Sequence, residues 1–300
     1  MADIGFVGLG RMGLPMCMCL VEAGYEVVAT DERSDARTDA AACGALWRDS
    51  PAEVAAAAGV LITMLPGPAA VSTAMLGSAG ALPAMAPGET WIDMTTNVPS
   101  AVRSVREQAI EQGVRVLEAP VGGDPEAARQ GRLQLYIGGE ADVLDDNRPM
   151  LEALADPQQI FLVGAHDAGY TTKLLVNLLW FGQAIATAEA LLVAKAAAID
   201  LRVLERVLSR SSAATAFIAR DLDRLFHGDY LTTFGLDRIC DELEAAIALA
   251  RDYQVPSALS DLVLQTYHRA LHRYGAADGE LLAVALLEEE GGLRLRPDAS

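Results

Sequence analysis

The spacing of hydrophobic positions changes at about residue 163. Before that point, short apolar runs alternate with Ala-rich amphipathic segments. The runs that predict strands are IGFV, EVVA, GVLITML, TWIDM, VRVLEAP, LQLYIGG and QQIFLV. The segments that predict helices are MGLPMCMCLVEAG, SPAEVAAAA, PAAVSTAML, PSAVRSVREQAIEQG and EADVLDDNRPMLEAL. Near-continuous apolar strands that alternate with helices predict βαβ units and a mostly parallel, doubly wound α/β sheet.

After Gly164 the pattern is helical only. GYTTKLLVNLLWFGQAIATAEALLVAKAAAID predicts one helix of about 30 residues and about 45 Å. Further helices are expected to about residue 290, with breaks at HGDYLTTF, YQVPSA and RYGAADGE. We therefore expect an α/β domain over 1–164, an all-α domain over 165–290 and a disordered tail over 291–300. A helix this long cannot bury its apolar faces against one sheet, so we expect it to cross between the domains and to help form a dimer.

Composition and charge exclude several classes of protein. The net charge of −18 argues against nucleic-acid binding, which needs a basic face, and against anionic membrane surfaces. We expect no membrane-spanning run, and MADIGFVG enters a strand-like run without a signal peptide, so the expected location is cytoplasmic. The four cysteines match neither a zinc spacing nor a disulfide framework, so we expect no metal site.

A glycine motif follows the first predicted strand. Gly8, Gly10 and Gly13 have the G-x-G-x-x-G spacing, with Leu9, Arg11 and Met12 between them. The first glycine permits a tight turn, the second lets a pyrophosphate approach the backbone, and the third lets helix and strand pack closely. Because a strand precedes the motif and an amphipathic helix follows it, the sequence predicts a dinucleotide-binding Rossmann domain.

The next predicted strand ends at Asp31, 18 residues past Gly13. An acidic side chain here accepts hydrogen bonds from the adenosine ribose and repels a 2′-phosphate, which favours NAD. Glu32 adds to that repulsion. Arg33 and Arg37 leave NADP open, because either could bind a 2′-phosphate.

Lys173 is one of only two lysines beside 21 arginines. Arginine cannot release a proton near neutral pH, whereas a lysine whose pKa is lowered from about 10.4 by desolvation can act as a general acid or base. A helix would place Gly169 and Asn177 on the same face as Lys173, where the glycine leaves room for a small molecule and the asparagine holds its hydroxyl. The alternative is a surface lysine whose stem covers apolar neighbours.

The sequence resembles the β-hydroxyacid dehydrogenases, which include 3-hydroxyisobutyrate dehydrogenase and tartronate semialdehyde reductase, over about residues 3–285. GFVGLGRMGLPM is similar to the family's N-terminal fingerprint, LITMLP to its cofactor loop, IDMTTNVP to its D-x-S-T-x-x-P and EAPVGG to its substrate loop. The resemblance implies a Rossmann domain, a helical domain and an active site in the cleft between them. It implies that Lys173 and Asn177 are catalytic. The cofactor-binding residues that it adds are Met64, Leu65, Pro66 and Thr96.

Three departures from the family pattern concern the substrate. The family's A-P-V-S-G-G has become Ala119-Pro120-Val121-Gly122-Gly123-Asp124, which loses a serine that helps to bind a carboxylate. Val176 replaces the first of two adjacent asparagines. After Phe234, the family's Lys-Asp-Leu has become Asp241-Glu242-Leu243.

The departures make the expected site less positive. We therefore hypothesise a substrate that carries an amine or is neutral, and whose cationic or hydroxyl group is bound by Asp124 or Asp241. In the alternative, both acids face water and the N–H groups of Gly122 and Gly123 still bind a carboxylate.

The sequence thus predicts an NAD(P)-dependent oxidoreductase that acts on the CH–OH group of a β-hydroxy acid, its semialdehyde or a modified analogue. An imine reductase of the same fold, or a dinucleotide-binding module without catalysis, are the alternatives. We expect a small-molecule substrate and a homodimer or homotetramer.

Overall fold

The computed structural model describes residues 2–297 and divides into two compact units, Met1–Lys173 and Leu174–Ser300. The division falls inside the long helix, after Lys173, whereas the sequence pattern predicts it after Gly164. Each unit has hydrophobic clusters of its own.

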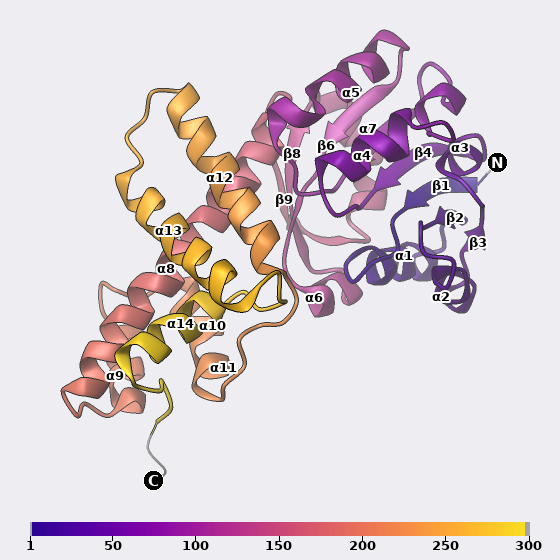
Figure 1. Ribbon diagram of the computed structural model, residues 1–300. Coiled ribbons are helices and arrows are strands. Elements are labelled where there is room, and N and C mark those ends of the chain that lie inside the picture. Colours follow the sequence, from indigo (N-terminus) through magenta and orange to yellow (C-terminus); the bar gives the residue numbers. More distant parts are fainter. Residues whose placement is uncertain (1, 298–300) are drawn as a thin grey trace. The chain divides into compact units, whose positions relative to one another are not determined.

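The first unit is built on one twisted sheet (Figure 1). Its strands run in the order β3-β2-β1-β4-β5-β6-β8-β7, with β9 beside β8. β8 is antiparallel to β6 and β7, and the other pairs are parallel. The predicted parallel-dominated sheet is therefore confirmed. The strands are β1 Ala2–Val7, β2 Val27–Thr30, β3 Leu46–Trp47, β4 Ala58–Thr63, β5 Thr90–Asp93, β6 Arg115–Glu118, β7 Val121–Gly122, β8 Leu133–Gly139 and β9 Ala155–Gly164.

Helices cover both faces of this sheet. Phe6 of β1 packs into one core together with Leu20 of α1, whereas the adjacent Val7 packs into the other core with Val71 of α4 and Val102 of α5. Alternate strand residues thus point to opposite faces, as a doubly wound fold requires. The helices are α1 Gly13–Glu22, α2 Ala36–Cys43, α3 Pro51–Ala55, α4 Pro68–Leu76, η1 Leu82–Ala84, α5 Pro99–Glu111, α6 Pro125–Arg129 and α7 Ala141–Leu151.

The last residues of five parallel strands form one row across the sheet. Val7 pairs with Thr30 and with Thr63, Thr63 pairs with Asp93, and Asp93 pairs with Glu118. The loops that follow these residues therefore leave the sheet at one edge, its carboxyl end. Ligands of open α/β sheets bind at this edge.

The second unit is helical and contains most of α8. Ala184 and Leu191 of this helix pack into one cluster, with α10 and α11, while Phe181 and Ile185 pack into another, with α12 and α13. The helices are α8 Ala168–Ala196, α9 Leu201–Leu208, α10 Ala216–Arg220, α11 Leu222–Phe226, α12 Leu236–Asp252, α13 Ala258–Tyr274 and α14 Leu282–Gly291.

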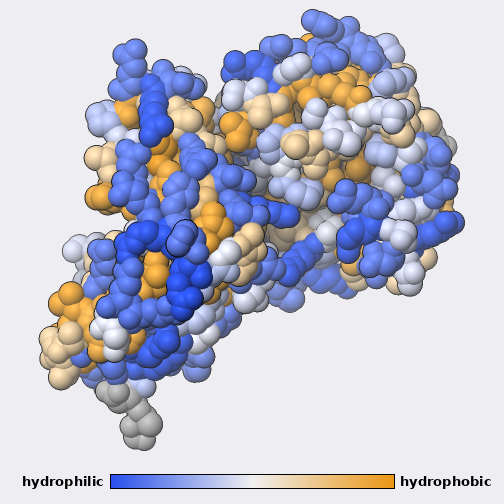
Figure 2. Space-filling model, in the orientation of Figure 1, coloured by the Kyte–Doolittle hydropathy of each residue, from blue (hydrophilic) through white to orange (hydrophobic). Residues whose placement is uncertain are grey.

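Among the described residues, α8 is the one helix long and apolar enough to cross a membrane by length and composition. No such run was expected from the sequence, so that expectation is corrected. Because α8 supplies side chains to two hydrophobic clusters, we interpret it as a core helix. On the face shown in Figure 2, hydrophilic residues predominate, and apolar residues gather where α9 lies.

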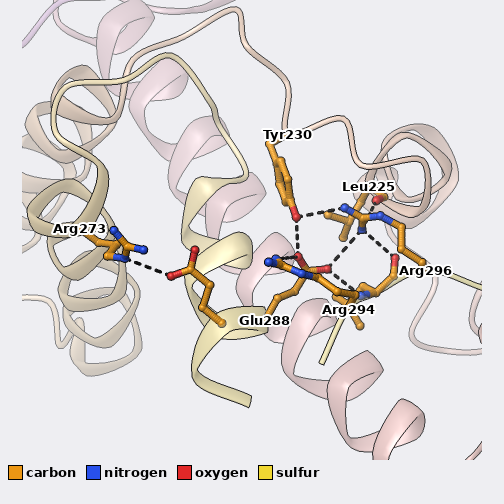
Figure 3. A network of polar contacts seen from close by, with 8 residues as sticks. Leu225, Tyr230, Arg273, Glu288, Arg294 and Arg296 are labelled. Atoms are coloured by element: carbon orange, nitrogen blue, oxygen red, sulfur yellow. Dashed lines mark hydrogen bonds and ion pairs between the residues drawn. The ribbon is translucent and has the colours of Figure 1, made fainter. Parts of the chain in front are cut away.

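The residues after α14 correct the predicted disordered tail as far as residue 297. Leu295 is fully buried in the helical core. Glu288 of α14 is also buried, and it forms ion pairs with Arg294 and Arg296 (Figure 3). Its carboxylate also accepts hydrogen bonds from the Leu295 N–H and from the Tyr230 hydroxyl. A buried carboxylate needs such partners, so Glu288 holds the residues after α14 in place. Residues 298–300 lie outside the described residues.

Candidate active site

The glycine loop between β1 and α1 has the shape that a pyrophosphate needs. Gly8 has a φ of +102°, and a Cβ there would lie 2.3 Å from the Met64 carbonyl oxygen. A Cβ at Gly13 would lie 1.9 Å from the Gly8 carbonyl oxygen. At Gly10, by contrast, a Cβ would have no neighbour within 4 Å among the described residues, so the backbone there faces open space. Because α1 begins beside it without a side-chain cap, the N–H groups of its first turn can bind an anion.

Asp31 is fixed beside this loop. Its Oδ2 accepts a hydrogen bond from the Leu9 N–H at 2.7 Å, and its Oδ1 accepts bonds from the N–H of Arg33 at 2.9 Å and from Arg33 Nε at 3.1 Å. The same guanidinium also donates to the Leu9 carbonyl oxygen at 3.0 Å. The acid thus lies next to the glycine loop, and Arg33 is held against it.

The two following loops reach the same edge of the sheet. The Met64 N–H donates to the Val7 carbonyl oxygen at 2.9 Å, and the Leu65 N–H donates to Thr95 Oγ1 at 3.1 Å. Four of the predicted cofactor-binding residues are half-buried: Met12, Met64, Leu65 and Thr96. Three are exposed: Gly10, Arg11 and Pro66. The predicted cofactor-binding residues of the first unit therefore gather at the carboxyl edge of the sheet.

A buried carboxylate that sequence reasoning did not single out lies at the end of β5. Asp93 is fully buried and accepts hydrogen bonds from Thr63 Oγ1 at 2.7 Å, from Tyr170 Oη at 2.7 Å and from Asn97. Burial raises the pKa of this carboxyl above its ordinary value. The only signal in the sequence was the leading Asp of IDMTTNVP. Because Tyr170 belongs to the first turn of α8, its hydrogen bond to Asp93 ties the beginning of this helix to the end of β5.

A second buried carboxylate, Glu118 at the end of β6, also reaches the beginning of α8. Its Oε1 accepts hydrogen bonds from Arg106 at 2.9 Å and from the Asp167 N–H at 2.7 Å. Arg106 also pairs with Asp167 Oδ1 at 2.6 Å, and Arg103 pairs with Asp167 Oδ2 at 2.7 Å. Burial raises the pKa of Glu118. For Asp167, burial acts in the same direction, but hydrogen bonds from Arg106 and Arg103 outweigh it, so the pKa is lowered.

Gly169 does not have the role that the sequence analysis expected. A Cβ at this position would lie 2.7 Å from the Tyr136 carbonyl oxygen and 2.9 Å from the Gly138 nitrogen. Gly169 is buried and lets α8 pack on β8, so it leaves no room for a small molecule. Lys173 follows one turn later and is half-buried.

In the substrate loop, Asp124 has a structural role. Gly122 is buried, Gly123 is exposed with a φ of +123°, and Asp124 is exposed. Asp124 Oδ1 accepts a hydrogen bond from the Ala127 N–H at 2.8 Å, which makes it the N-cap of α6. A capping role explains this acid without a substrate, because Asp is a preferred N-cap residue.

In the second unit, Glu242 rather than Asp241 contacts the predicted catalytic asparagine. Asn177 Nδ2 donates to Glu242 Oε2 at 2.5 Å. Asp241, one residue earlier on α12, is exposed, but partial desolvation, together with repulsion from Glu244 and Asp237, still raises its pKa. Phe234 is half-buried and packs against the cluster that α12 and α13 share. The signal for Glu242 was its place in the altered Lys-Asp-Leu pattern.

Two family models together match most of the chain. The NAD-binding domain of 6-phosphogluconate dehydrogenase matches residues 3–164, and the NAD-binding domain of NADP-dependent 3-hydroxyisobutyrate dehydrogenase matches residues 167–287. These ranges cover the α/β unit and the helical unit in turn.

Individual relatives agree with the models. The chain is 35% identical to the NAD-dependent L-serine dehydrogenase of Pseudomonas aeruginosa, over 71% of this chain and 70% of that protein. It is 37% identical to the 3-hydroxyisobutyrate dehydrogenase of the same organism, over the same shares. The structure of Mycobacterium tuberculosis 3-hydroxyisobutyrate dehydrogenase with L-serine superposes with a TM-score of 0.85 at 28% identity, covering 95% of this chain and 99% of that one. The chain therefore belongs to the β-hydroxyacid dehydrogenase family.

Proposed function

We propose that the protein transfers a hydride between NAD and the CH–OH carbon of a β-hydroxy acid, with Lys173 as the general acid and base. Family membership supports the reaction class, an NAD(P)-dependent dehydrogenation of a hydroxy acid. The substrate, the roles of individual residues and the preference for NAD go beyond it.

One observation carries the assignment of Lys173. Asp93 and Glu118 end neighbouring strands at the edge that also holds the glycine loop, and both bind the beginning of α8, through Tyr170 and Asp167. The helix that carries Lys173 is therefore fixed to the dinucleotide-binding edge of the sheet. Tyr170 precedes Lys173 by three residues, so the anchor and the lysine are neighbours on the helix.

The chain's own residues supply binding and proton transfer. When bound, the nicotinamide accepts or supplies the hydride. In oxidation, the Lys173 amine takes the proton of the substrate hydroxyl; in reduction, its ammonium returns a proton to the carbonyl oxygen. Asn177, oriented by Glu242, holds the reacting oxygen. Of the two N–H groups in the alternative that the sequence left open, the one at exposed Gly123 binds the carboxylate, because Gly122 is paired with Gln134 of β8.

The preference for NAD over NADP rests on Asp31. Its carboxylate is held toward the glycine loop by the Leu9 N–H, where it would accept hydrogen bonds from the adenosine ribose hydroxyls and would repel a 2′-phosphate. Arg33, the candidate phosphate ligand, is drawn to this carboxylate instead.

For the substrate, we propose a three-carbon or four-carbon 3-hydroxy acid that bears a hydrogen-bond donor at carbon 2. The relatives that act on L-serine and on 3-hydroxyisobutyrate support this size. The family's serine, which helps to bind the substrate carboxylate, is missing at position 122. This loss supports a substrate that has another polar group to bind, the hydrogen-bond donor at carbon 2.

The test is NADH formation from NAD with L-serine, 3-hydroxyisobutyrate and 3-hydroxypropionate. We expect Lys173→Ala and Lys173→Arg to lose at least about 100-fold in kcat while NADH binding persists. Lys195→Arg is the matched control, because Lys195 lies on the same helix and donates to the Arg296 carbonyl oxygen. Full activity of Lys173→Arg would refute the role in proton transfer.

We also propose a homodimer or homotetramer in the cytoplasm. Exposed apolar side chains support the assembly: Leu179 and Val193 of α8 are 64% and 71% exposed, and Val207 of α9 is 55% exposed. Free thiols at the four cysteines are consistent with a reducing compartment. Sedimentation of the wild type and of Val193→Asp tests the assembly, and a monomeric wild type would refute it.

A further inference from the structure

The side chain of Tyr136 lies against the substrate loop. β7 pairs antiparallel to β8, with Gly122 opposite Gln134. A Cβ at Gly122 would lie 2.6 Å from Tyr136 Oη and 3.1 Å from Gln134 Oε1. Real Cβ atoms essentially never come within 3.0 Å of another heavy atom, so a side chain at position 122 would require the hydroxyl of Tyr136 to shift.

Backbone conformation does not explain this glycine. Gly122 is not among the glycines with positive φ, whereas its neighbour Gly123 is. Any residue could adopt the strand conformation of Gly122 if the space beside it were open. The tyrosine hydroxyl thus lies where a side chain at position 122 would begin.

The hydrogen bonds of Tyr136 limit what its oxygen can bind. The hydroxyl donates its one proton to Gln134 Oε1 at 2.9 Å, and Gln134 Nε2 donates to Gln159 Oε1 at 2.8 Å. The side chain is buried, and burial raises the pKa of the phenol, which keeps it neutral. The oxygen is left with lone pairs and can accept a hydrogen bond, but it has no proton for a carboxylate.

We infer that Tyr136 is a specificity-determining residue, whose oxygen accepts a hydrogen bond from an ammonium or hydroxyl group on carbon 2 of the substrate. A serine at position 122 would have donated to a carboxylate, so the exchange reverses the direction of the hydrogen bond. The inference rests on the proposed function and adds the residue that recognises the donor on carbon 2 of the substrate. Asp124 caps a helix, which leaves Tyr136 as the polar side chain against Gly122 together with Gln134.

The experiment compares two substrates that differ only in the amine, L-serine and 3-hydroxypropionate. Tyr136→Phe keeps the ring and removes the oxygen. We expect it to raise KM for L-serine about ten-fold with little change in kcat, and to alter KM for 3-hydroxypropionate by less than about two-fold. Tyr25→Phe, a half-buried tyrosine of the same unit, is the control for losing a phenol hydroxyl elsewhere.

A double variant gives a second measurement that does not depend on weakening the wild type. Gly122→Ser combined with Tyr136→Phe provides space for the serine, and we expect it to favour 3-hydroxypropionate over L-serine. Gly122→Ser alone should lower the midpoint of thermal unfolding, because the hydroxyl of Tyr136 remains in place.

The possible outcomes separate this inference from the proposed function. Equal changes in KM for both substrates, or none, would overturn the role of Tyr136 while leaving the proposed function intact. No turnover of either substrate by the wild type, with NAD bound, would refute the proposed function and this inference with it.

Discussion

Tyr170 donates a hydrogen bond from its phenol oxygen to Asp93 Oδ2 at 2.7 Å, and so joins the first turn of α8 to the end of β5. Both side chains are buried, and they lie 77 residues apart in the sequence. Through this bond, the sheet that carries the dinucleotide site also orients the helix that carries the proposed catalytic lysine.

The first prediction concerns this bond. Tyr170→Phe should lower the free energy of unfolding by about 1–2 kcal/mol, because Asp93 loses one of its donors. It should also lower kcat more than it raises KM, because Lys173 is displaced rather than removed. Tyr267→Phe is the control: this buried tyrosine of the second unit donates to the Glu280 carbonyl oxygen at 3.0 Å. Equal losses of kcat in both variants would contradict a positioning role.

The second prediction concerns the cofactor. Asp31→Asn keeps an acceptor for the Leu9 N–H but removes the charge, which also releases Arg33 for a 2′-phosphate. We expect kcat/KM with NADP to rise at least about ten-fold relative to NAD. Initial rates with each cofactor measure the change. Glu32→Gln, an exposed acid beside it, should shift the ratio far less. An unchanged ratio in Asp31→Asn would remove the basis for the NAD preference.

The third prediction is a pH dependence. The pKa of Asp167 is lowered in the folded protein, so the folded state favours the ionised carboxyl, and its pairing stabilises the fold above the unfolded pKa of about 4. That contribution disappears as the pH falls through the lower, folded-state pKa. Asp167→Asn should therefore cost about 1–2 kcal/mol at pH 7, and the difference from the wild type should shrink below about pH 4.

Urea unfolding at several pH values checks this dependence. Asparagine tolerates the left-handed backbone of position 167, where φ is +78°, so the substitution tests the charge and not the conformation. Asp145→Asn removes an exposed acid that pairs with Arg148 and should cost less than about 0.5 kcal/mol. A pH-independent difference for Asp167→Asn would contradict the assigned ion pairs.

The fourth prediction compares two adjacent acids on α12. Glu242→Gln should change kcat/KM about ten-fold or more, because the carboxylate that accepts the bond from Asn177 is lost. Asp241→Asn should change it by less than about two-fold, because that side chain is exposed. Rates measured from pH 6 to 10 should show a displaced profile for Glu242→Gln only. The reverse result would restore Asp241 as the specificity residue that the sequence suggested.

The local pattern determined the architecture. Alternating strands and helices, with a glycine motif between the first strand and the first helix, specify a doubly wound sheet, because periodicity and turn chemistry act within a few residues. The strands β3 and β7 were missed, since two residues are too few to show a period. Asp31, the acid directly after β2, could also be predicted, because the dinucleotide-binding fold places such an acid at a fixed position.

Only the tertiary structure decided which polar side chains meet. Asn177 and Glu242 are 65 residues apart, and nothing in either local sequence selects Glu242 over its neighbour Asp241. Gly169 was interpreted from its helical face, but packing against β8 decides its role. Gly122 was interpreted as a lost serine, and only the β7–β8 pair shows that Tyr136 lies where its side chain would begin. Sequence spacing fixes the elements and their faces, whereas the partner of a buried polar group depends on which elements the fold packs together.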